Sequence, residues 1–203
     1  MQIKIDTNGI FFENTYLLIK GRDLVIVDPG SNINLAEVNK YNLKAILITH
    51  AHIDHIDGLK YFTKGKIPLY ISKLDEAKLT NPSSSLYQMT GTKISFKPSD
   101  FEIRNVTDKM KFTLLDEEFM VLTTPGHTNG SVCYLVKNIL FSGDTLFKNS
   151  IGRTDFETGS MTDMKQSLNK LANLANEIKV YPGHDEITSI KEEKKNNPYL
   201  KKS

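Results

Sequence analysis

The feature that most constrains this chain is the stretch THAHIDHIDG at residues 49–58. Three of the five histidines and one aspartate fall there within six consecutive positions. The stretch continues directly from AILIT at 45–49, a short apolar run typical of a buried strand. Crowding of this kind is costly unless a cation binds the side chains. The sequence therefore predicts a strand that ends in a cation site.

The other two histidines also lie in turns that follow predicted strands. His127 stands in TPGHT and His184 in YPGH, while Asp144 ends the apolar run of FSGDT. Turns at strand ends are where rigid scaffolds display functional groups. Imidazole and carboxylate ligands without a thiolate suit zinc, iron or manganese. The pattern therefore indicates a metal centre rather than isolated histidines.

The spacing within the cluster indicates two ions. Residues two apart in an extended segment point the same way, so His50 and His52 can reach one ion. The chain then turns, and Asp54 and His55 can serve a second ion. Either remaining histidine can complete each set, and Asp144 has two carboxylate oxygens with which to bridge them.

Strand and helix patterns run through both halves of the chain without a linker, so residues 1–203 are expected to form a single domain. Strands are predicted within 1–12 and at 15–19, 24–28, 45–49, 68–72, 111–115, 119–123, 132–136, 139–142 and 179–181. Helices are predicted at 34–40, from 59 onward, and at 75–79, 161–174 and 189–196, with a long surface loop at 80–110 that holds one strand or two. Each half offers a sheet followed by helices. We therefore expect an α/β fold, an αββα sandwich of two packed mixed β-sheets with helices on the outer faces.

Composition narrows the choice of partners. A net charge of +2 gives no general reason to expect nucleic acid or a membrane surface. No secretory signal is expected, because the opening MQIKIDTNGIFF is typical of a first strand, and no apolar run approaches the ~20 residues that span a bilayer. The single cysteine, Cys133, excludes an internal disulfide and is expected to be a buried small hydrophobe. A cytoplasmic protein with a small-molecule substrate fits these features.

The order of HAHIDH, PGH, GDT and YPGH resembles the metallo-β-lactamase-fold hydrolases over nearly the whole chain. The stretch GDTLFKNSIGRTDF at 143–156 is similar to that of short glyoxalase II-type proteins. The resemblance implies three ligands for a first metal, three for a second and one bridge. These are His50, His52 and His127 for the first, Asp54, His55 and His184 for the second, and Asp144 between them.

By the same resemblance, the expected reaction is hydrolysis of a thioester such as S-lactoylglutathione. Two divalent ions, zinc first with iron or manganese also open, would hold a bridging hydroxide that attacks the carbonyl. Asp54 and Asp144 are the expected catalytic carboxylates. A thiolate leaves readily, since a free thiol has a pKa of about 8.5, so no strong acid is required.

Several residues around the ligands carry further hypotheses. Asp28 in VDPG either accepts a hydrogen bond from a metal-bound imidazole or only begins a turn. Arg153 either binds a substrate carboxylate or pairs with Asp155 in its own turn. Asp57 is expected to cap a helix. Two residues of the long loop, Tyr87 and Met89, are candidates for the cleft wall.

Other reactions remain open at this point. Persulfide dioxygenases share the fold and a GRTDF-like stretch, and would use His50, His127 and Asp144 for one iron. Hydrolysis of β-lactams is less expected, because those enzymes are generally exported. A metal-binding module without activity is the third alternative. The oligomeric state is left open.

Overall fold

Within residues 1–7 and 9–200, which this computed structural model describes, two six-stranded β-sheets pack face to face. The first sheet has the order β1-β2-β3-β4-β5-β6. Its strands are β1 (Gln2–Asp6), β2 (Thr15–Lys20), β3 (Asp23–Val27), β4 (Asn42–Leu47), β5 (Pro68–Ser72) and β6 (Glu102–Val106). The first three strands run antiparallel, whereas β3 to β6 are parallel neighbours, so the sheet is mixed.

The second sheet has the order β12-β11-β10-β9-β8-β7. Its strands are β7 (Lys111–Leu114), β8 (Glu117–Thr123), β9 (Val132–Val136), β10 (Ile139–Gly143), β11 (Lys179–Pro182) and β12 (Thr188–Ser189). The pair β10 and β11 is parallel and the other pairs are antiparallel, so this sheet is mixed as well.

The central strands are buried on both faces, which explains their continuous apolar sequences. Along β2, Tyr16 and Leu18 face the second sheet, while Leu17 and Ile19 face the helices. This alternation follows from the two-residue period of a strand. Between the sheets, Phe119, Val121, Tyr134 and Phe141 meet the first sheet, so the middle layer of the core is made by both halves.

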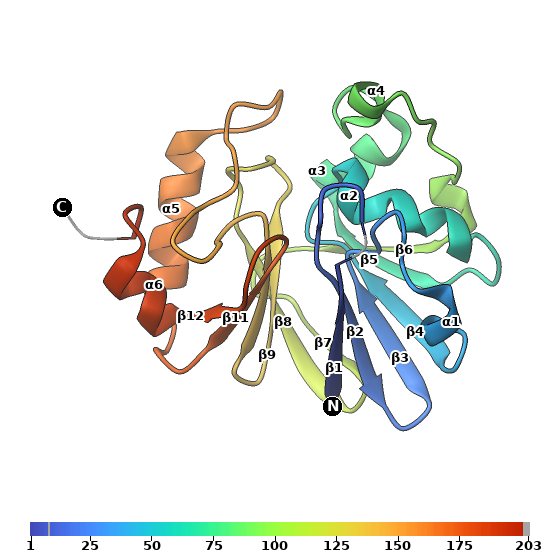
Figure 1. Cartoon of the computed structure of the whole chain (residues 1–203), viewed down its shortest axis with the longest axis horizontal. Helices are drawn as coiled ribbons and strands as arrows, with labels where there is room; N and C mark the ends of the chain where they lie inside the picture. Colours follow the sequence, from blue (N-terminus) through green and yellow to red (C-terminus); the bar gives the residue numbers. More distant parts are fainter. Residues whose placement is uncertain (8, 201–203) are drawn as a thin grey trace.

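Helices cover the two outer sides, as Figure 1 shows. The first sheet is covered by α1 (Leu35–Val38), α2 (Ile53–Ile56), α3 (Lys73–Glu76) and α4 (Tyr87–Thr90), with the 3-10 turns η1 (Asp57–Phe62), η2 (Ala77–Thr80) and η3 (Pro98–Asp100). The second sheet is covered by α5 (Met161–Ala172) and α6 (Ile190–Asn196). The expected αββα sandwich of two mixed sheets is therefore confirmed. None of the helices in the described part of the chain is long and apolar enough to cross a membrane.

Most predicted elements are present, with differences at their starts. The helix expected from residue 59 begins earlier, because α2 starts at Ile53 and continues as η1. Ile53, Ile56 and Leu59 lie three residues apart and are all buried, which favours a helical turn directly after the histidines. The predicted loop at 80–110 contains one strand, β6, together with short helical turns. Strand β12 was not predicted, because two residues carry no periodicity.

Candidate metal centre and cleft

The candidate ligands gather where strands of both sheets end. His50 and His52 follow β4, and Asp54 and His55 lie on the short helix α2. The second sheet provides three more residues, in the turns that follow β8, β10 and β11: His127, Asp144 and His184. The close approach at the last of these ends requires glycine, because a Cβ atom on Gly183 would lie 2.1 Å from an oxygen of Asp144.

The donor atoms form three overlapping groups, and within each group they lie within 4.8 Å of one another. One group joins His50, His52 and His127, and another joins Asp54, His55 and His184. The third group takes one histidine from each of the others and adds Asp144, which places this carboxylate between the two triads. These are the ligands expected from the sequence, and the structure brings them together.

Unsatisfied polar atoms mark the space between these side chains. Among the described residues, only four buried side-chain polar atoms lack a hydrogen-bond partner. Three of them are His50 Nε2, His55 Nε2 and Asp144 Oδ1, all in the third group. Buried polar groups normally have a hydrogen-bond partner. Two imidazole nitrogens and one carboxylate oxygen that lack one, all within the same group, fit ligands of a divalent cation. The residues present therefore suit a metal ion.

The outer nitrogens of three histidines are held by neighbouring oxygens. His55 Nδ1 lies 3.1 Å from Asp28 Oδ2, and His127 Nδ1 lies 2.7 Å from the Arg153 carbonyl oxygen. His50 Nδ1 lies 3.2 Å from Thr49 Oγ1, which donates its own hydrogen to Asp28 Oδ2 at 2.6 Å. These oxygens accept, so each Nδ1 carries a hydrogen and Nε2 is the atom that each imidazole can offer to a metal. The Nε2 atom of His127 also lies 2.8 Å from His52 Nδ1.

The electrostatics of the site also favour a bound cation. Burial lowers the pKa of His50 well below its usual value and that of His52 to about 3, so both imidazoles are neutral ligands at pH 7. Burial opposes charge on His55 as well, but the carboxylates of Asp54 and Asp144 outweigh it and raise its pKa. In turn the nearby histidines hold the pKa of Asp144 well below its usual value. The two carboxylates therefore stay negative and attract positive charge.

A buried ion pair beneath the cluster was not predicted from the sequence. Asp75 on α3 is fully buried and accepts hydrogen bonds from the backbone of Ala51 at 2.7 Å and from Thr128 Oγ1 at 3.0 Å. Lys78 Nζ, also buried, lies 2.5 Å from Asp75 Oδ1 and 2.9 Å from Thr158 Oγ1. Asp75 thus links the segment that carries His50 and His52 to the turn at 127–131. The pair itself is only three residues apart, but its bonds to Ala51, Thr128 and Thr158 join distant segments, so the sequence did not reveal its place beside the histidines.

The candidate ligands form the floor of a cleft of about 360 Å³. Five of the seven line it: His52, Asp54, His127, Asp144 and His184. Its walls are mostly apolar and come from three segments: Phe11, Leu86, Met89, Phe147, Ile151 and Phe156. Clefts with apolar walls and a few convergent polar groups are typical of small-molecule sites.

Three of the surrounding residues differ from, or refine, the expectation. Asp57 is the C-cap of α2, where its backbone N–H donates to the Ile53 carbonyl oxygen. Its side chain does not cap a helix but accepts from Tyr87 Oη at 3.0 Å and from Lys60 Nζ at 2.6 Å. Tyr87 is fully buried and does not line the cleft, whereas Met89 does. Arg153 lines the cleft and pairs with the carboxylate beside it, Asp155.

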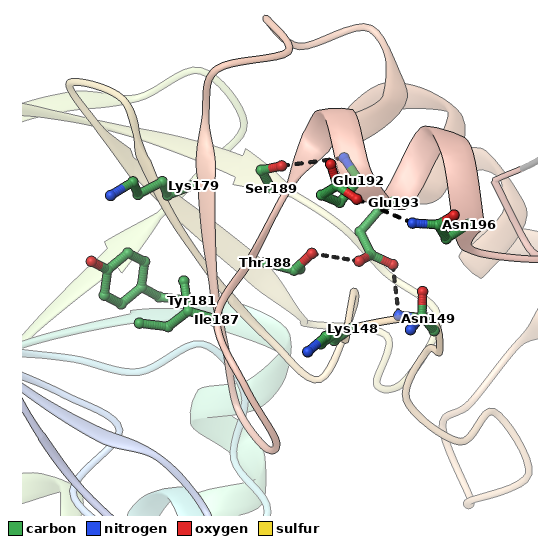
Figure 2. Close-up of a pocket in the computed structure, with 10 residues that line it drawn as sticks. All are labelled: Lys148, Asn149, Lys179, Tyr181, Ile187, Thr188, Ser189, Glu192, Glu193 and Asn196. Atoms are coloured by element: carbon green, nitrogen blue, oxygen red, sulfur yellow. Dashed lines mark hydrogen bonds between the residues drawn. The ribbon is translucent and has the colours of Figure 1, made fainter.

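A second hollow of about 440 Å³ lies between β11, β12 and α6, away from the histidines. Figure 2 shows Glu193 at its centre, bonded to Thr188 Oγ1 and to the backbone nitrogen of Asn149. Asn197 Nδ2 also donates to this carboxylate and to the Phe147 carbonyl oxygen. Both oxygens of Glu193 therefore accept hydrogen bonds, and Oε2 ties α6 to the turn that carries Phe147 into the cleft wall.

Comparisons with known proteins agree with this fold and site. Residues 8–184 match the model of the Metallo-beta-lactamase superfamily. A probable metallo-hydrolase of Streptococcus pyogenes is 33% identical over 98% of this chain and 90% of its own length. A hydroxyacylglutathione hydrolase of Buchnera aphidicola is 32% identical over 90% of this chain and 67% of its own length.

Solved structures show the same likeness. The crystal structure of BLEG-1 B3 metallo-beta-lactamase has a TM-score of 0.89 at 34% identity, covering 99% of this chain and 100% of that one. The crystal structure of TTHA1623 in a di-iron-bound form has a TM-score of 0.79 at 30% identity, and the match covers 97% of this chain and 100% of that one. The crystal structure of ETHE1 from Myxococcus xanthus has a TM-score of 0.78 at 28% identity, and the match covers 100% of this chain and 86% of that one. The chain belongs to the metallo-beta-lactamase superfamily, and its histidines and aspartates form a site suited to a divalent metal.

Proposed function

We propose that the protein is a dinuclear metal-dependent hydrolase that cleaves thioesters, of the glyoxalase II type, with S-lactoylglutathione as the reference substrate. The observation that carries the proposal is the pair of donor triads on either side of Asp144 at the floor of the cleft. The likeness to the Buchnera hydroxyacylglutathione hydrolase supports the reaction type.

The ligand assignment follows the donor groups. One ion is assigned to His50, His52 and His127, the other to Asp54, His55 and His184, with Asp144 shared. Two divalent ions, zinc first with iron or manganese as alternatives, would supply a nucleophile from water at neutral pH and an electrophile for the substrate carbonyl.

The chain's own residues prepare this site. Asp28 and the Arg153 carbonyl fix the imidazoles of His55 and His127, so their Nε2 atoms point inward before any ion binds. The carboxylates of Asp54 and Asp144 lie at the cleft floor and remain charged, because nearby histidines lower their pKa against the effect of burial. The described lining of the cleft contains no further acid, which suits a thiolate leaving group.

Two other reactions deserve the same assays. A persulfide dioxygenase would use one iron on His50, His127 and Asp144, and the likeness to ETHE1 keeps it as the second candidate. The likeness to BLEG-1 adds β-lactams to the substrates to be tried. A metal-binding module without activity is less well supported, because an open cleft lies directly above the donors.

Elemental analysis of protein purified without chelators, followed by substrate assays on the same sample, tests the proposal. About two metal ions per chain and release of thiol from S-lactoylglutathione would support it. One iron per chain, with oxygen consumed on a persulfide and no thioester cleaved, would refute it. Cys133 is buried, so it will not consume the thiol reagent in the native protein. His52→Ala should lose metal and activity, whereas the exposed Asp116→Asn should keep both.

A further inference from the structure

Two of the large apolar side chains in the walls of the cleft are left open to solvent. Phe11, in the turn before β2, is 52% exposed, and Met89 on α4 is 66% exposed. Neither belongs to the three apolar clusters of the core. Contiguous exposed apolar groups beside a polar site usually mark a binding surface.

These walls are held in place by the backbone around them. The amide of Phe11 donates to Glu13 Oε2 at 3.0 Å, and Glu13 itself is buried. Leu86, which precedes α4, has a φ of 65°, a left-handed conformation that is strained for leucine. Such strain persists only where the surroundings impose it, and it concentrates at functional sites. The positions of Phe11 and Leu86 in the cleft wall are therefore fixed by the folded backbone.

Aromatic rings flank both donor triads. The Phe156 ring lies 5.2 Å from the His52 ring and 5.7 Å from the His127 ring. On the other side, the Phe147 ring lies 5.8 Å from the His184 ring. A carbonyl bound over the donors would consequently place its attached groups against aromatic surface on either side.

The cleft offers little free positive charge to an anionic substrate. Arg153 is the one lysine or arginine among the described residues that line it. Its Nε and Nη2 atoms donate to the two oxygens of Asp155 at 2.9 and 2.8 Å, and its guanidinium stacks on Phe156 at 4.4 Å. A glutathione carboxylate would therefore have to compete with Asp155 for this cation.

We propose that the cleft selects thioesters by an apolar, uncharged group beside the reacting carbonyl rather than by the carboxylates of glutathione. This inference rests on the proposed thioester hydrolysis and names its preferred substrate class. The reaction breaks the C–S bond, forms a C–O bond from water, and releases a carboxylate, a thiol and a proton. The apolar acyl chain would lie against Phe11, Met89 and Phe156.

The test compares acyl thioesters of the neutral thiol N-acetylcysteamine, from acetyl to octanoyl, with S-lactoylglutathione on the metal-loaded enzyme. We expect kcat/KM to rise with chain length, by up to about four-fold for each methylene that becomes fully buried. Alkyl thioethers of the same thiol contain no scissile carbonyl. Their affinity, measured by calorimetry, should rise with chain length in the same way, independently of turnover.

Variants inside and outside the cleft lining test whether the dependence on acyl chain length arises in the cleft. Met89→Ser and Phe11→Ser should each flatten the dependence on chain length for both turnover and thioether binding. Leu74→Ser, at a position that is 57% exposed on α3 but outside the cleft lining, should leave it unchanged.

The outcomes separate this inference from the proposed function. A flat series, or a clear preference for S-lactoylglutathione, would overturn the inference and leave the thioester hydrolase standing. If no thioester is cleaved, the proposed function fails, and thioether binding alone still decides whether the cleft selects apolar groups.

Discussion

Replacing Lys78 by methionine tests the buried ion pair that supports the histidine strand end. The Lys78 side chain is 4% exposed and that of Asp75 is fully buried, and their charged atoms lie 2.5 Å apart. Methionine keeps most of the apolar stem and removes the charge. Leaving one member of a buried pair uncompensated costs roughly 3–5 kcal/mol. The bonds from Ala51 and Thr128 to Asp75 remain, so we expect the lower end of this range.

The same helix provides the control. Lys73 and Glu76 are also three residues apart, at 2.9 Å, but the lysine side chain is 75% exposed. Exposed pairs contribute about 0–1 kcal/mol, so Lys73→Met should change little. Urea unfolding of the metal-free proteins, monitored by circular dichroism, gives the two free energies of unfolding at matched m-values. For a chain of this size, the larger loss corresponds to a Tm decrease of roughly 6–12 °C.

A functional measurement accompanies the stability measurement. Asp75 binds the backbone of Ala51, the residue between His50 and His52, so a disturbed carboxylate should weaken metal binding by about ten-fold. Equal unfolding free energies for Lys78→Met and Lys73→Met would refute the reasoning. The double variant Lys78→Met/Asp75→Asn should lose less stability than the sum of the single variants, because no buried charge is left unpaired.

Three further predictions concern the metal centre and the core. Removing the metal with a chelator should lower Tm by roughly 8–16 °C for each ion lost, relative to protein at a metal concentration 1,000 times Kd, measured by differential scanning fluorimetry. Asp28→Ala removes the acceptor of His55 and Thr49, so competition with a chromophoric chelator should show an affinity about 10–100-fold lower. Burial raises the pKa of Cys133 to about 11, so at pH 8 a thiol reagent should react only after unfolding, and reaction of the native protein would contradict this.

The sequence predicts much of the fold because its central strands are apolar on both faces. The runs at 24–28 and 132–136 need no partner information to be identified as buried strands, and both are strands in the structure. The start of α2 was missed because His52 makes no capping bond that a sequence pattern would reveal. Its position instead follows from the burial of Ile53 and Ile56, which depends on the sheet beneath.

In the candidate site too, some residues could be predicted from the sequence and others could not. The seven candidate donors that the structure brings together were predicted from the sequence, because they lie at the ends of predicted strands or in the helical turn that follows one, and imidazoles rarely crowd without a cation. Their supports were found only in part: Asp28 was among the candidates, whereas Asp75, Lys78 and the Arg153 carbonyl were not. A backbone carbonyl has no sequence signature, and the contact between Asp75 and Ala51 spans 24 positions. Physical supports of this kind arise from tertiary packing.

The layout of the donors has a consequence for how metal and fold depend on each other. His50 to His55 come from the first sheet, whereas His127, Asp144 and His184 come from the second. Each donor triad therefore takes ligands from both sheets. The triads exist only when the sheets are packed, so the free energy of metal binding stabilises the packing of one sheet on the other rather than a single loop. In return, the packing of the two sheets keeps the Nε2 atoms of His50 and His55 buried beside the carboxylate of Asp144.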